Sequence, residues 1–440
     1  MEGKGCMISR ISVKKLFGRF DYDITAKPGG ITIITGPNGF GKSTILKIVN
    51  ALSKGNIAYF VKLDFLSIVV EYDSNNKTKI DKKKQGIAID DIVFQDLDEE
   101  SIDHIQSAIR RPWIQRIQGG FFDRRTDEVI PEDDFFYQMF IDSDSRYFGG
   151  FSSKSEWGKS LKIEQLKEKL DDIRKWCGDV RFITDQRLIQ TKIGRSDEPQ
   201  VVDVIRELPQ RLKAQISKVS EEYSRVANTL DSSYPKRLFA AKEGIKNQSE
   251  YKACLEDANE KFKKLSNYNL VSMSIIDEKN YIPEYSTALK IYFDDFAEKY
   301  KVFQDLIEKL DLFTKIINNR LSFKQIRITR DDGFQVVDNE NPQKVLQLSQ
   351  LSSGEKQEIV LFYELIFDTK ENLLLLIDEP EISLHITWQK KFLDDLVEVS
   401  RQTALQVIVA THSPQIVSNH LDIQIDLGES YGNKLHTQQS

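Results

Sequence analysis

Residues 36–44 of the chain read GPNGFGKST and lie between two apolar runs. The run at residues 31–35 has the character of a buried strand, and a helix-like run begins at Thr44. A strand, a glycine-rich turn and a helix form the context that the phosphate-binding motif G-x-x-x-x-G-K-[ST] requires. The glycines let several backbone N–H groups point inward, and the helix N-terminus adds its positive dipole. The stretch therefore predicts a polyphosphate site.

In such a site the lysine pairs with β- and γ-phosphate oxygens, and the following hydroxyl holds Mg²⁺. Lys42 and Ser43 occupy these two positions. The residues predicted to bind the phosphates are Gly36, Asn38, Gly39, Gly41, Lys42, Ser43 and Thr44. A chance match in a glycine-rich turn is the alternative, and it requires that no other part of the chain completes the site.

The chain of 440 residues is long enough for two or three domains. Its hydrophobic content of 40% and charged content of 30% are those of an ordinary soluble protein. The start lacks the apolar region of a signal peptide, and no run approaches the length needed to cross a bilayer. We therefore expect a cytoplasmic protein that does not enter a membrane.

Cysteine content and net charge indicate which kinds of site and partner the protein is expected to have. The three cysteines form no C-x-x-C pair, so they indicate neither a disulfide framework nor a zinc site. The net charge of −6 does not favour nucleic acid as a partner of the whole protein, although a local basic patch remains compatible with it.

Strand patterns flank the phosphate-binding motif. Residues 8–13 alternate apolar and polar side chains, and residues 28–30 form a turn. Residues 65–72 and 77–80 predict an antiparallel hairpin around a turn at 73–76. Further strands are predicted at residues 180–183, 326–328, 334–337, 373–377 and 405–410.

Three apolar stripes with helical spacing occupy residues 204–317. The first is expected to end at residues 232–235, because Pro235 blocks helix continuation. The second covers residues 251–265, and the third covers residues 289–317. We interpret them as an inserted helical arm of roughly 120 residues, in which a helix of ~24 residues reaches about 36 Å.

Arginines and aromatic residues alternate in one segment, which reads RRPWIQR at 110–116 and FFDRR at 121–125. This composition suits stacking on bases and contacts with backbone phosphates. An exposed segment whose aromatic side chains pack inward while its arginines are solvated explains the same composition. We favour this second interpretation.

A second candidate anion site lies at residues 351–357, which read LSSGEKQ before a helix-like run. Ser352, Ser353 and Gly354 would present hydroxyls, free N–H groups and a helix dipole together. A simple N-cap, with Ser352 or Ser353 as the capping residue, explains the same pattern.

Two predicted buried strands end in polar residues. The run at 373–377 leads into Asp378 and Glu379, and the run at 405–410 leads toward His412. The carboxyl ends of parallel strands meet where α/β sheets bind ligands. Asp378 is then placed to hold Mg²⁺, Glu379 to accept a proton from the attacking water, and His412 to reach that water or the γ-phosphate. Acids that only cap a strand, and a structural histidine, are the alternatives.

Together these motifs resemble the heads of ABC-type ATPases. Residues 36–44 are similar to the Walker A loop, 351–357 to the signature motif and 373–379 to the Walker B strand, and His412 is similar to the switch histidine. The chain also contains DEPEISLH at residues 378–385 and ATHSP at residues 410–414. This wording resembles the overcoming-lysogenization-defect family and related SMC-like ATPases of bacterial antiphage defence.

The resemblance implies an α/β fold, an ABC-type head with a parallel P-loop core sheet and an antiparallel β subdomain. Its expected parts are residues 1–195, an inserted helical arm at 196–320 and residues 321–440. The resemblance also implies ATP and Mg²⁺ as cofactors and hydrolysis of ATP to ADP and phosphate. Gln186 is the expected Q-loop residue, and Gln95, which is nearer the usual spacing, is the alternative.

The chain departs from the sequence patterns of several related ATPase groups, and these departures make some of the possible functions less favoured. SSGE stands where transporter subunits usually keep SGGQ, and the short arm lacks the zinc hook of double-strand-break repair ATPases. Only residues 413–440 follow His412, which leaves no room for the fused Toprim nuclease of the overcoming-lysogenization-defect enzymes. We therefore expect a separately encoded effector, a nuclease or a toxin.

In this family the signature motif of one head faces the Walker A loop of another. The resemblance therefore implies a head-to-head homodimer or a larger homo-oligomer. The leading hypothesis is the sensor subunit of an antiphage defence system that controls a separate effector. The alternatives are a repair or recombination ATPase acting on nucleic acid, and a scaffold that binds ATP but barely hydrolyses it.

Overall fold

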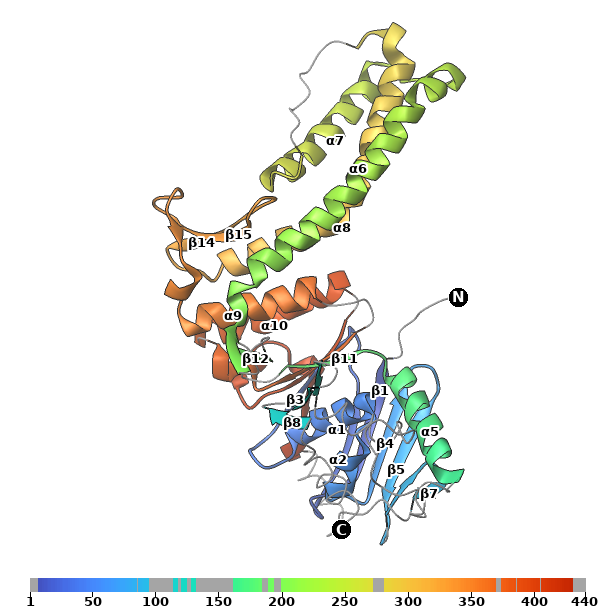
Figure 1. Ribbon diagram of the computed structural model, residues 1–440, viewed down its shortest axis with the longest axis vertical. Helices are drawn as coiled ribbons and strands as arrows, with labels where there is room; N and C mark the ends of the chain where they lie inside the picture. Colours follow the sequence, from blue (N-terminus) through green and yellow to red (C-terminus); the bar gives the residue numbers. More distant parts are fainter. Residues whose placement is uncertain are drawn as a thin grey trace. The chain divides into compact units, whose positions relative to one another are not determined.

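The structure is a computed structural model, drawn in Figure 1. The residues that it describes are 7–84, 86–94, 114–117, 120–124, 128–131, 161–183, 189–193, 199–271, 281–368, 373–384, 386–403 and 405–429. Gln186 and its alternative Gln95 lie outside these residues, as do Arg110, Arg111 and Trp113.

The chain divides into two compact units. The first contains residues 1–186 and 369–440, and the second contains residues 187–368. The second unit is therefore an insertion into the first. The boundaries expected from the sequence lie after residues 195 and 320, according to the positions of the motifs. That functional division stays a prediction.

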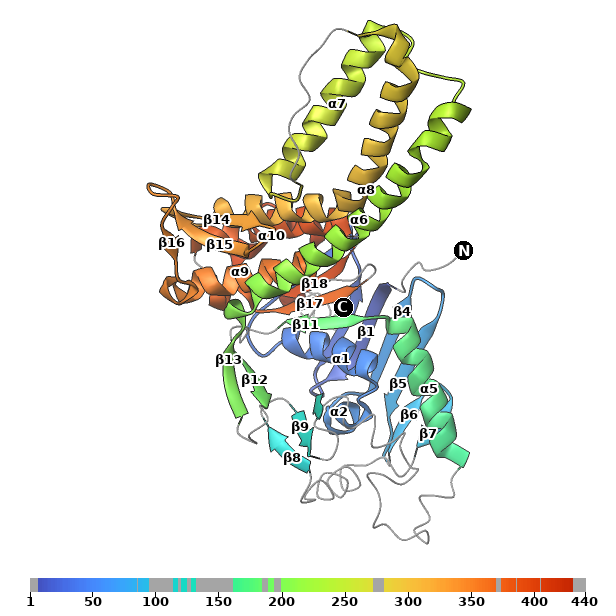
Figure 2. The same ribbon diagram turned by 45° about the horizontal axis from the view of Figure 1, so that its top comes forward.

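A five-stranded parallel sheet forms the centre of the first unit. Its strand order is β11, β17, β18, β3 and β19. The strands are β11 (Val180–Ile183), β17 (Leu374–Asp378), β18 (Gln406–Ala410), β3 (Ile31–Thr35) and β19 (Gln424–Asp426). Every residue of β3 and β18 is buried, as expected for strands covered on both faces. The predicted core strands are confirmed, and β18 pairs with β3 on one side and with β17 on the other. Figure 2 shows β17 and β18 side by side.

The first unit also contains a six-stranded antiparallel sheet with the order β2, β1, β4, β5, β6 and β7. These strands are β2 (Phe20–Thr25), β1 (Ile8–Leu16), β4 (Ser67–Tyr72), β5 (Lys77–Lys82), β6 (Ile87–Ile89) and β7 (Ile92–Phe94). β4 and β5 pair antiparallel on either side of residues 73–76, which confirms the predicted hairpin.

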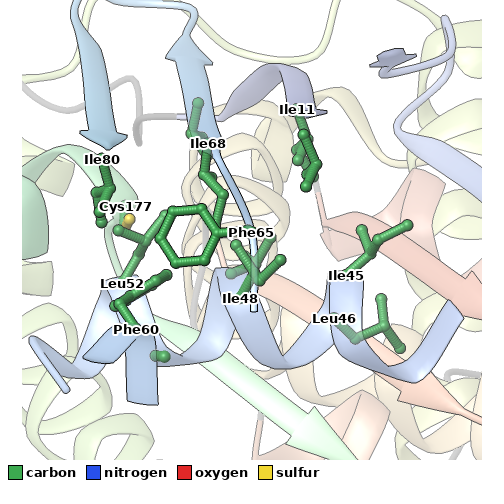
Figure 3. Packing of buried hydrophobic residues seen from close by; sticks show 14 of the residues in the cluster. Ile11, Ile45, Leu46, Ile48, Leu52, Phe60, Phe65, Ile68, Ile80 and Cys177 are labelled. Carbon is green, nitrogen blue, oxygen red and sulfur yellow. The ribbon is translucent and has the colours of Figure 1, made fainter. Parts of the chain in front are cut away.

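Helix α1 (Lys42–Lys54) is buried in a core that both sheets share. This core contains Ile11 and Ile68 from the antiparallel sheet as well as Leu376 and Ile408 from the parallel sheet. Figure 3 shows Ile11 and Ile68 on the side of α1 that carries Ile45 and Ile48. Because each fully buried aliphatic side chain contributes roughly 1.5–3 kcal/mol, this packing holds α1 firmly against the two sheets.

A buried glutamine joins the two sheets of the first unit. Gln406, the first residue of β18, accepts a hydrogen bond from the Ile8 N–H at 2.9 Å. The side-chain amide of Gln406 donates to the Ile8 carbonyl oxygen at 2.7 Å. The glutamine thereby satisfies both backbone groups of the residue that begins β1.

Three helices form the elongated part of the second unit. They are α6 (Leu208–Ala240), α7 (Gln248–Asn267) and α8 (Ser286–Asn318). The ring of Phe262 in α7 stacks on Phe296 of α8 with centroids 4.4 Å apart, and Tyr223 of α6 lies 5.1 Å from Phe303 of α8. The three helices predicted from the apolar stripes are confirmed.

The predicted break at residues 232–235 is wrong, because α6 continues through Pro235 to Ala240. Arg237, two residues after the proline, makes side-chain contacts on both sides of it. Its Nη2 donates to the Leu230 carbonyl oxygen at 2.8 Å, and its guanidinium pairs with Asp295 of α8. These contacts join the end of α6 beyond the proline to the preceding turn and to α8. α6 and α8 have 33 residues each, so each reaches about 50 Å, more than expected.

The second unit continues from α8 into a small antiparallel sheet and α9 (Ser353–Phe367). The strands of this sheet are β14 (Lys324–Thr329), β15 (Gly333–Asp338) and β16 (Val345–Leu346). The predicted hairpin at 326–337 is confirmed. Arg320, just after α8, and Glu358 of α9 form an ion pair whose side chains are only 1% and 3% exposed.

The remaining elements complete the two units. They are α2 (Ile57–Lys62), β8 (Ile114–Ile117), β9 (Gly120–Asp123), β10 (Glu128–Pro131), α5 (Leu161–Cys177), β12 (Ile189–Ile193), β13 (Pro199–Asp203), α10 (Ile386–Thr403) and α11 (Pro414–Val417). Among the described helices, none combines the length and the apolar character that crossing a bilayer demands.

The described part of the arginine-rich segment fits the second of its two interpretations. Phe121 and Phe122 of β9 are 3% and 2% exposed. Arg124 is exposed, and its Nη2 donates to Gln115 Oε1 at 3.1 Å. These aromatic side chains therefore pack inward while the arginine faces solvent.

Candidate active site

Glycines hold the loop after β3 in a path that other residues rarely adopt. Gly39 and Gly41 both have φ 83°, in the left-handed region. A Cβ on Gly41 would lie 2.9 Å from Leu16 Cδ2, so a side chain there would meet both backbone strain and a core residue. The phosphate-binding motif therefore has the backbone shape that its sequence predicted.

The first turn of α1 presents backbone donors toward the loop. Gly41 caps this helix without a side chain, so no side-chain oxygen accepts from its first N–H groups. Such N–H groups and the helix dipole together favour an anion. Asn38 and Gly39 lie exposed at the loop tip, and Thr44 is half-buried in the first turn.

Lys42, the first residue of α1, folds its side chain back over the loop. Its side chain is 5% exposed, and Nζ donates to the carbonyl oxygens of Gly36 at 3.0 Å and Pro37 at 3.3 Å. Glu379 Oε1 lies 4.0 Å from Nζ. The ion pair with Glu379 is long, so the charge of this buried ammonium can still be offered to an anionic ligand.

Ser43 and Asp378 meet although 335 positions separate them in the sequence. Ser43 Oγ donates to Asp378 Oδ1 at 2.8 Å. The order of the sheet explains the contact. Asp378 is the last residue of β17, and only β18 separates β17 from β3, the strand that leads into the loop before Ser43. A hydroxyl and a carboxylate are hard oxygen ligands, so this pair fits Mg²⁺.

Glu379 follows β17 in a strained backbone conformation, with φ 46° and ψ 56°. A left-handed residue other than glycine costs of order 1–3 kcal/mol and often marks a functional site. Burial raises the pKa of Glu379, the Glu381 carboxylate raises it further, and His412 offsets part of the rise. Glu379 therefore binds a proton more tightly than an ordinary glutamate, as a general base near neutral pH requires.

His412 lies beside two carboxylates. Its Nδ1 is hydrogen-bonded to Glu379 Oε2 and lies 3.2 Å from Glu381 Oε1. The strand ends of β17 and β18 thus bring Asp378, Glu379 and His412 to one edge of the sheet, close to Lys42 and Ser43. This arrangement can bind a polyphosphate and activate a water molecule beside it.

Comparison with known families identifies the chain. Residues 7–417 match the family model described as the AAA ATPase domain, AAA_15. The chain belongs to this family. It is therefore an ATPase, as predicted from the sequence, and the matched region contains every residue of the candidate site described above. Comparison with curated proteins gave no match.

Several solved structures show a distant likeness to this ATPase. One is the Smc head domain with an extended coiled coil from Pyrococcus furiosus, bound to the C-terminal domain of ScpA. Its TM-score is 0.38 and its sequence identity is 12%, and the match covers 99% of this chain and 100% of that chain. The SMC head domain from Thermotoga maritima has a TM-score of 0.33 and 11% identity, with coverage of 94% and 92%. The recombination mediator protein RecF-ATPrS of the RecFOR pathway has a TM-score of 0.31 and 12% identity, with coverage of 96% and 98%. No activity or partner of this ATPase follows from likeness at this level.

The serine-rich turn of the ATPase belongs to the second unit. Ser352 is the N-cap of α9, where its Oγ accepts from the Glu355 N–H, and the Glu355 carboxylate accepts from the Ser352 N–H at 2.8 Å. The capping interpretation therefore holds for Ser352. Ser352 and Ser353 are exposed and Gly354 is partly exposed, so the role predicted for them opposite another head stays a prediction.

Sequence reasoning missed Glu381 in the candidate site. Its side chain is 7% exposed, and Oε1 accepts from Thr411 Oγ1 at 2.7 Å and from the N–H groups of His412 at 3.0 Å and Ser413 at 3.1 Å. The sequence did carry a signal, since Glu381 follows the same strand end as Asp378. The pattern alone did not show that a turn would aim it at the next strand.

Proposed function

We propose that this ATPase hydrolyses MgATP at the edge of its parallel sheet and uses the reaction as a switch for a separate effector protein. The contact of Ser43 with Asp378, beside Lys42 and Glu379, carries the catalytic part of this proposal. These four side chains supply a cation, two metal ligands and a base, which together form the minimal set for phosphoryl transfer to water.

Each side chain has one role in the proposed reaction. Lys42 exchanges its carbonyl contacts for β- and γ-phosphate oxygens, and the N–H groups of residues 36–44 hold the remaining charge. Ser43 and Asp378 hold Mg²⁺, which when bound neutralises charge on the transferred phosphoryl group. Glu379 accepts a proton from water as the water oxygen bonds to the γ-phosphorus. The bond from that phosphorus to the β–γ bridging oxygen breaks, and ADP leaves. His412 orients Glu379 and the water.

The proposed assembly is a head-to-head dimer or a larger homo-oligomer. In it, Ser352, Ser353 and Gly354 of one copy would cover the nucleotide bound by another copy. The exposure of both serines supports this role, because a covered turn could not reach a second copy. Closure with ATP and opening after hydrolysis would give two states that bind an effector differently.

The proposed cellular role is that of a sensor and regulatory subunit in bacterial antiphage defence. It rests on the resemblance of DEPEISLH at 378–385 and ATHSP at 410–414 to such ATPases. The effector would be a separate nuclease or toxin.

The catalytic proposal is tested with Glu379→Gln, which keeps the size of the side chain but cannot accept the proton. We expect phosphate release to fall by roughly 10²–10⁴-fold while ATP still binds and dimers accumulate in light scattering. Full turnover by this variant would contradict the role of Glu379.

The cellular proposal is tested by phage challenge of a host that carries the chain with its neighbouring genes. Lys42→Ala should abolish protection, and pull-down should recover the effector from the same operon. Unchanged phage sensitivity on Lys42→Ala would contradict the defence role. Stimulation of the ATPase by DNA would instead favour a repair function.

A further inference from the structure

Buried Glu381 makes its hydrogen bonds through one of its two carboxylate oxygens, and within the described residues Oε2 has no partner. Its Oε1 accepts from three donors, and all three belong to residues 411–413, which follow β18. A buried charge is costly unless it is well hydrogen-bonded, so such a residue persists where its contacts have a use. Here the contacts converge on one loop.

The loop at 411–413 has few other restraints on its path. Thr411 is fully buried, and its N–H donates to the Ile34 carbonyl oxygen at 3.1 Å. Ser413 Oγ donates to Gln389 Oε1 at 2.9 Å. Between these two anchors, the backbone of His412 is held by its N–H donating to Glu381. His412 itself is half-exposed, so packing alone does not fix its ring.

The turn after β17 aims two carboxylates at the same imidazole. Glu379 is left-handed, its N–H donates to the Ala410 carbonyl oxygen at 2.9 Å, and residues 380–383 form a short helical turn. This path brings Glu379 Oε2 and Glu381 Oε1 to the same nitrogen of His412. The Glu379 carboxylate therefore contacts the His412 ring, while the Glu381 carboxylate contacts both the ring and the backbone N–H of His412.

We infer that Glu381 is a positioning residue of the ATPase, whose carboxylate holds residues 411–413 so that the His412 ring stays beside Glu379. The inference rests on the proposed function of Glu379 and His412. Glu381 would not touch the nucleotide. It would act through His412. A half-exposed side chain can take several ring positions, and Glu381 would hold the ring in one of them.

A kinetic comparison of three variants tests this inference in the full chain. Glu381→Leu removes the acceptor with little change in volume. It should lower kcat on the order of 100-fold, the scale that misplacement by about 1 Å produces, and leave KM for ATP unchanged. Glu381→Gln keeps an acceptor oxygen and should recover most of the lost kcat. Asp394→Leu is the matched control, because Asp394 also contacts a histidine, His420, but on the surface.

The decisive measurement places Glu381→Leu in a His412→Ala background. If Glu381 acts through His412, the double variant has the kcat of His412→Ala alone. Losses that multiply would overturn the inference while leaving the proposed function intact. An unchanged kcat in His412→Ala would overturn both, so the two failures are distinguishable.

A second variant covers the case in which Glu381→Leu does not fold. Thr411→Val keeps the shape of a fully buried side chain and removes one of the three donors to Glu381, together with one acceptor of the Ser413 N–H. It should lower kcat less than Glu381→Leu, and the loss should vanish in the His412→Ala background. A loss that persists there would overturn the inference.

Discussion

The two units of the molecule differ in how they accommodate buried charge. In the first unit, buried Lys42 contacts carbonyl oxygens, and buried Glu381 accepts from N–H and hydroxyl groups. In the second unit, the buried charges of Arg320 and Glu358 face each other as an ion pair. Charges held by backbone groups remain available to a ligand or a moving loop, whereas a closed pair holds two structural elements together.

The ion pair of the second unit offers the largest test of this difference. Arg320→Met should lower the free energy of unfolding of that unit by about 3–5 kcal/mol, because buried Glu358 loses its ion-pair partner. Hydrogen exchange in α8 and α9 measures the loss. Arg225→Met is the control, since exposed Arg225 pairs with exposed Glu222. Equal effects of the two variants would contradict a structural role for the buried pair.

A charge change in the first unit should affect activity instead of stability. Asp378→Asn weakens the predicted metal ligand, so we expect kcat to fall by about 10²–10³-fold and the Mg²⁺ requirement to rise. Turnover is measured across a Mg²⁺ titration, and chelation of the metal should abolish it in the unaltered protein. Asp422→Asn, at an exposed carboxylate outside the site, is the control. A loss of stability that parallels the loss of kcat would argue against this assignment.

Pro235 gives a smaller effect of opposite sign. Pro235→Ala restores a backbone donor inside α6, so the second unit should gain about 1–2 kcal/mol after the entropy change of the unfolded chain is counted. Pro209→Ala is the matched control, because Pro209 lies in the first turn of the same helix, where proline is tolerated. The free energy of unfolding of each variant, from urea titration, decides the comparison. A destabilised Pro235→Ala would contradict this prediction, because the proline would then cost α6 no stability.

The smallest effect concerns Glu355 at the start of α9. Burial alone would raise its pKa, but Lys324 and the N–H and hydroxyl of Ser352 outweigh burial and hold the pKa below its usual 4.5. The resulting stability is present above pH 4.5 and is lost as the pH falls through the lowered pKa. Because Lys324 is partly exposed, we expect less than about 1 kcal/mol.

Lys324→Met should remove most of this pH dependence. Urea unfolding between about pH 3 and pH 6, on both sides of the usual pKa of a glutamate, would show the change. Lys344→Met, on the exposed chain before β16, is the control. An identical pH dependence in Lys324→Met and the unaltered protein would contradict the ion pair.

The sequence by itself determined the features that depend on short stretches of chain. Glycine spacing fixed the loop at 36–44, and uninterrupted apolar runs fixed the core strands β3, β17 and β18, since backbone preference and burial act locally. Parallel strands share one edge for their carboxyl ends, so the convergence of Asp378 and His412 was also predictable.

Only the tertiary structure decided how side chains from distant stretches meet. The Gln406 contact with Ile8, the pairing of Arg237 in α6 with Asp295 in α8, and the hydrogen bonds of Glu381 with residues 411–413 all join partners far apart in the sequence. Such contacts are set by three-dimensional packing and hydrogen-bond geometry, which no periodicity in the sequence records.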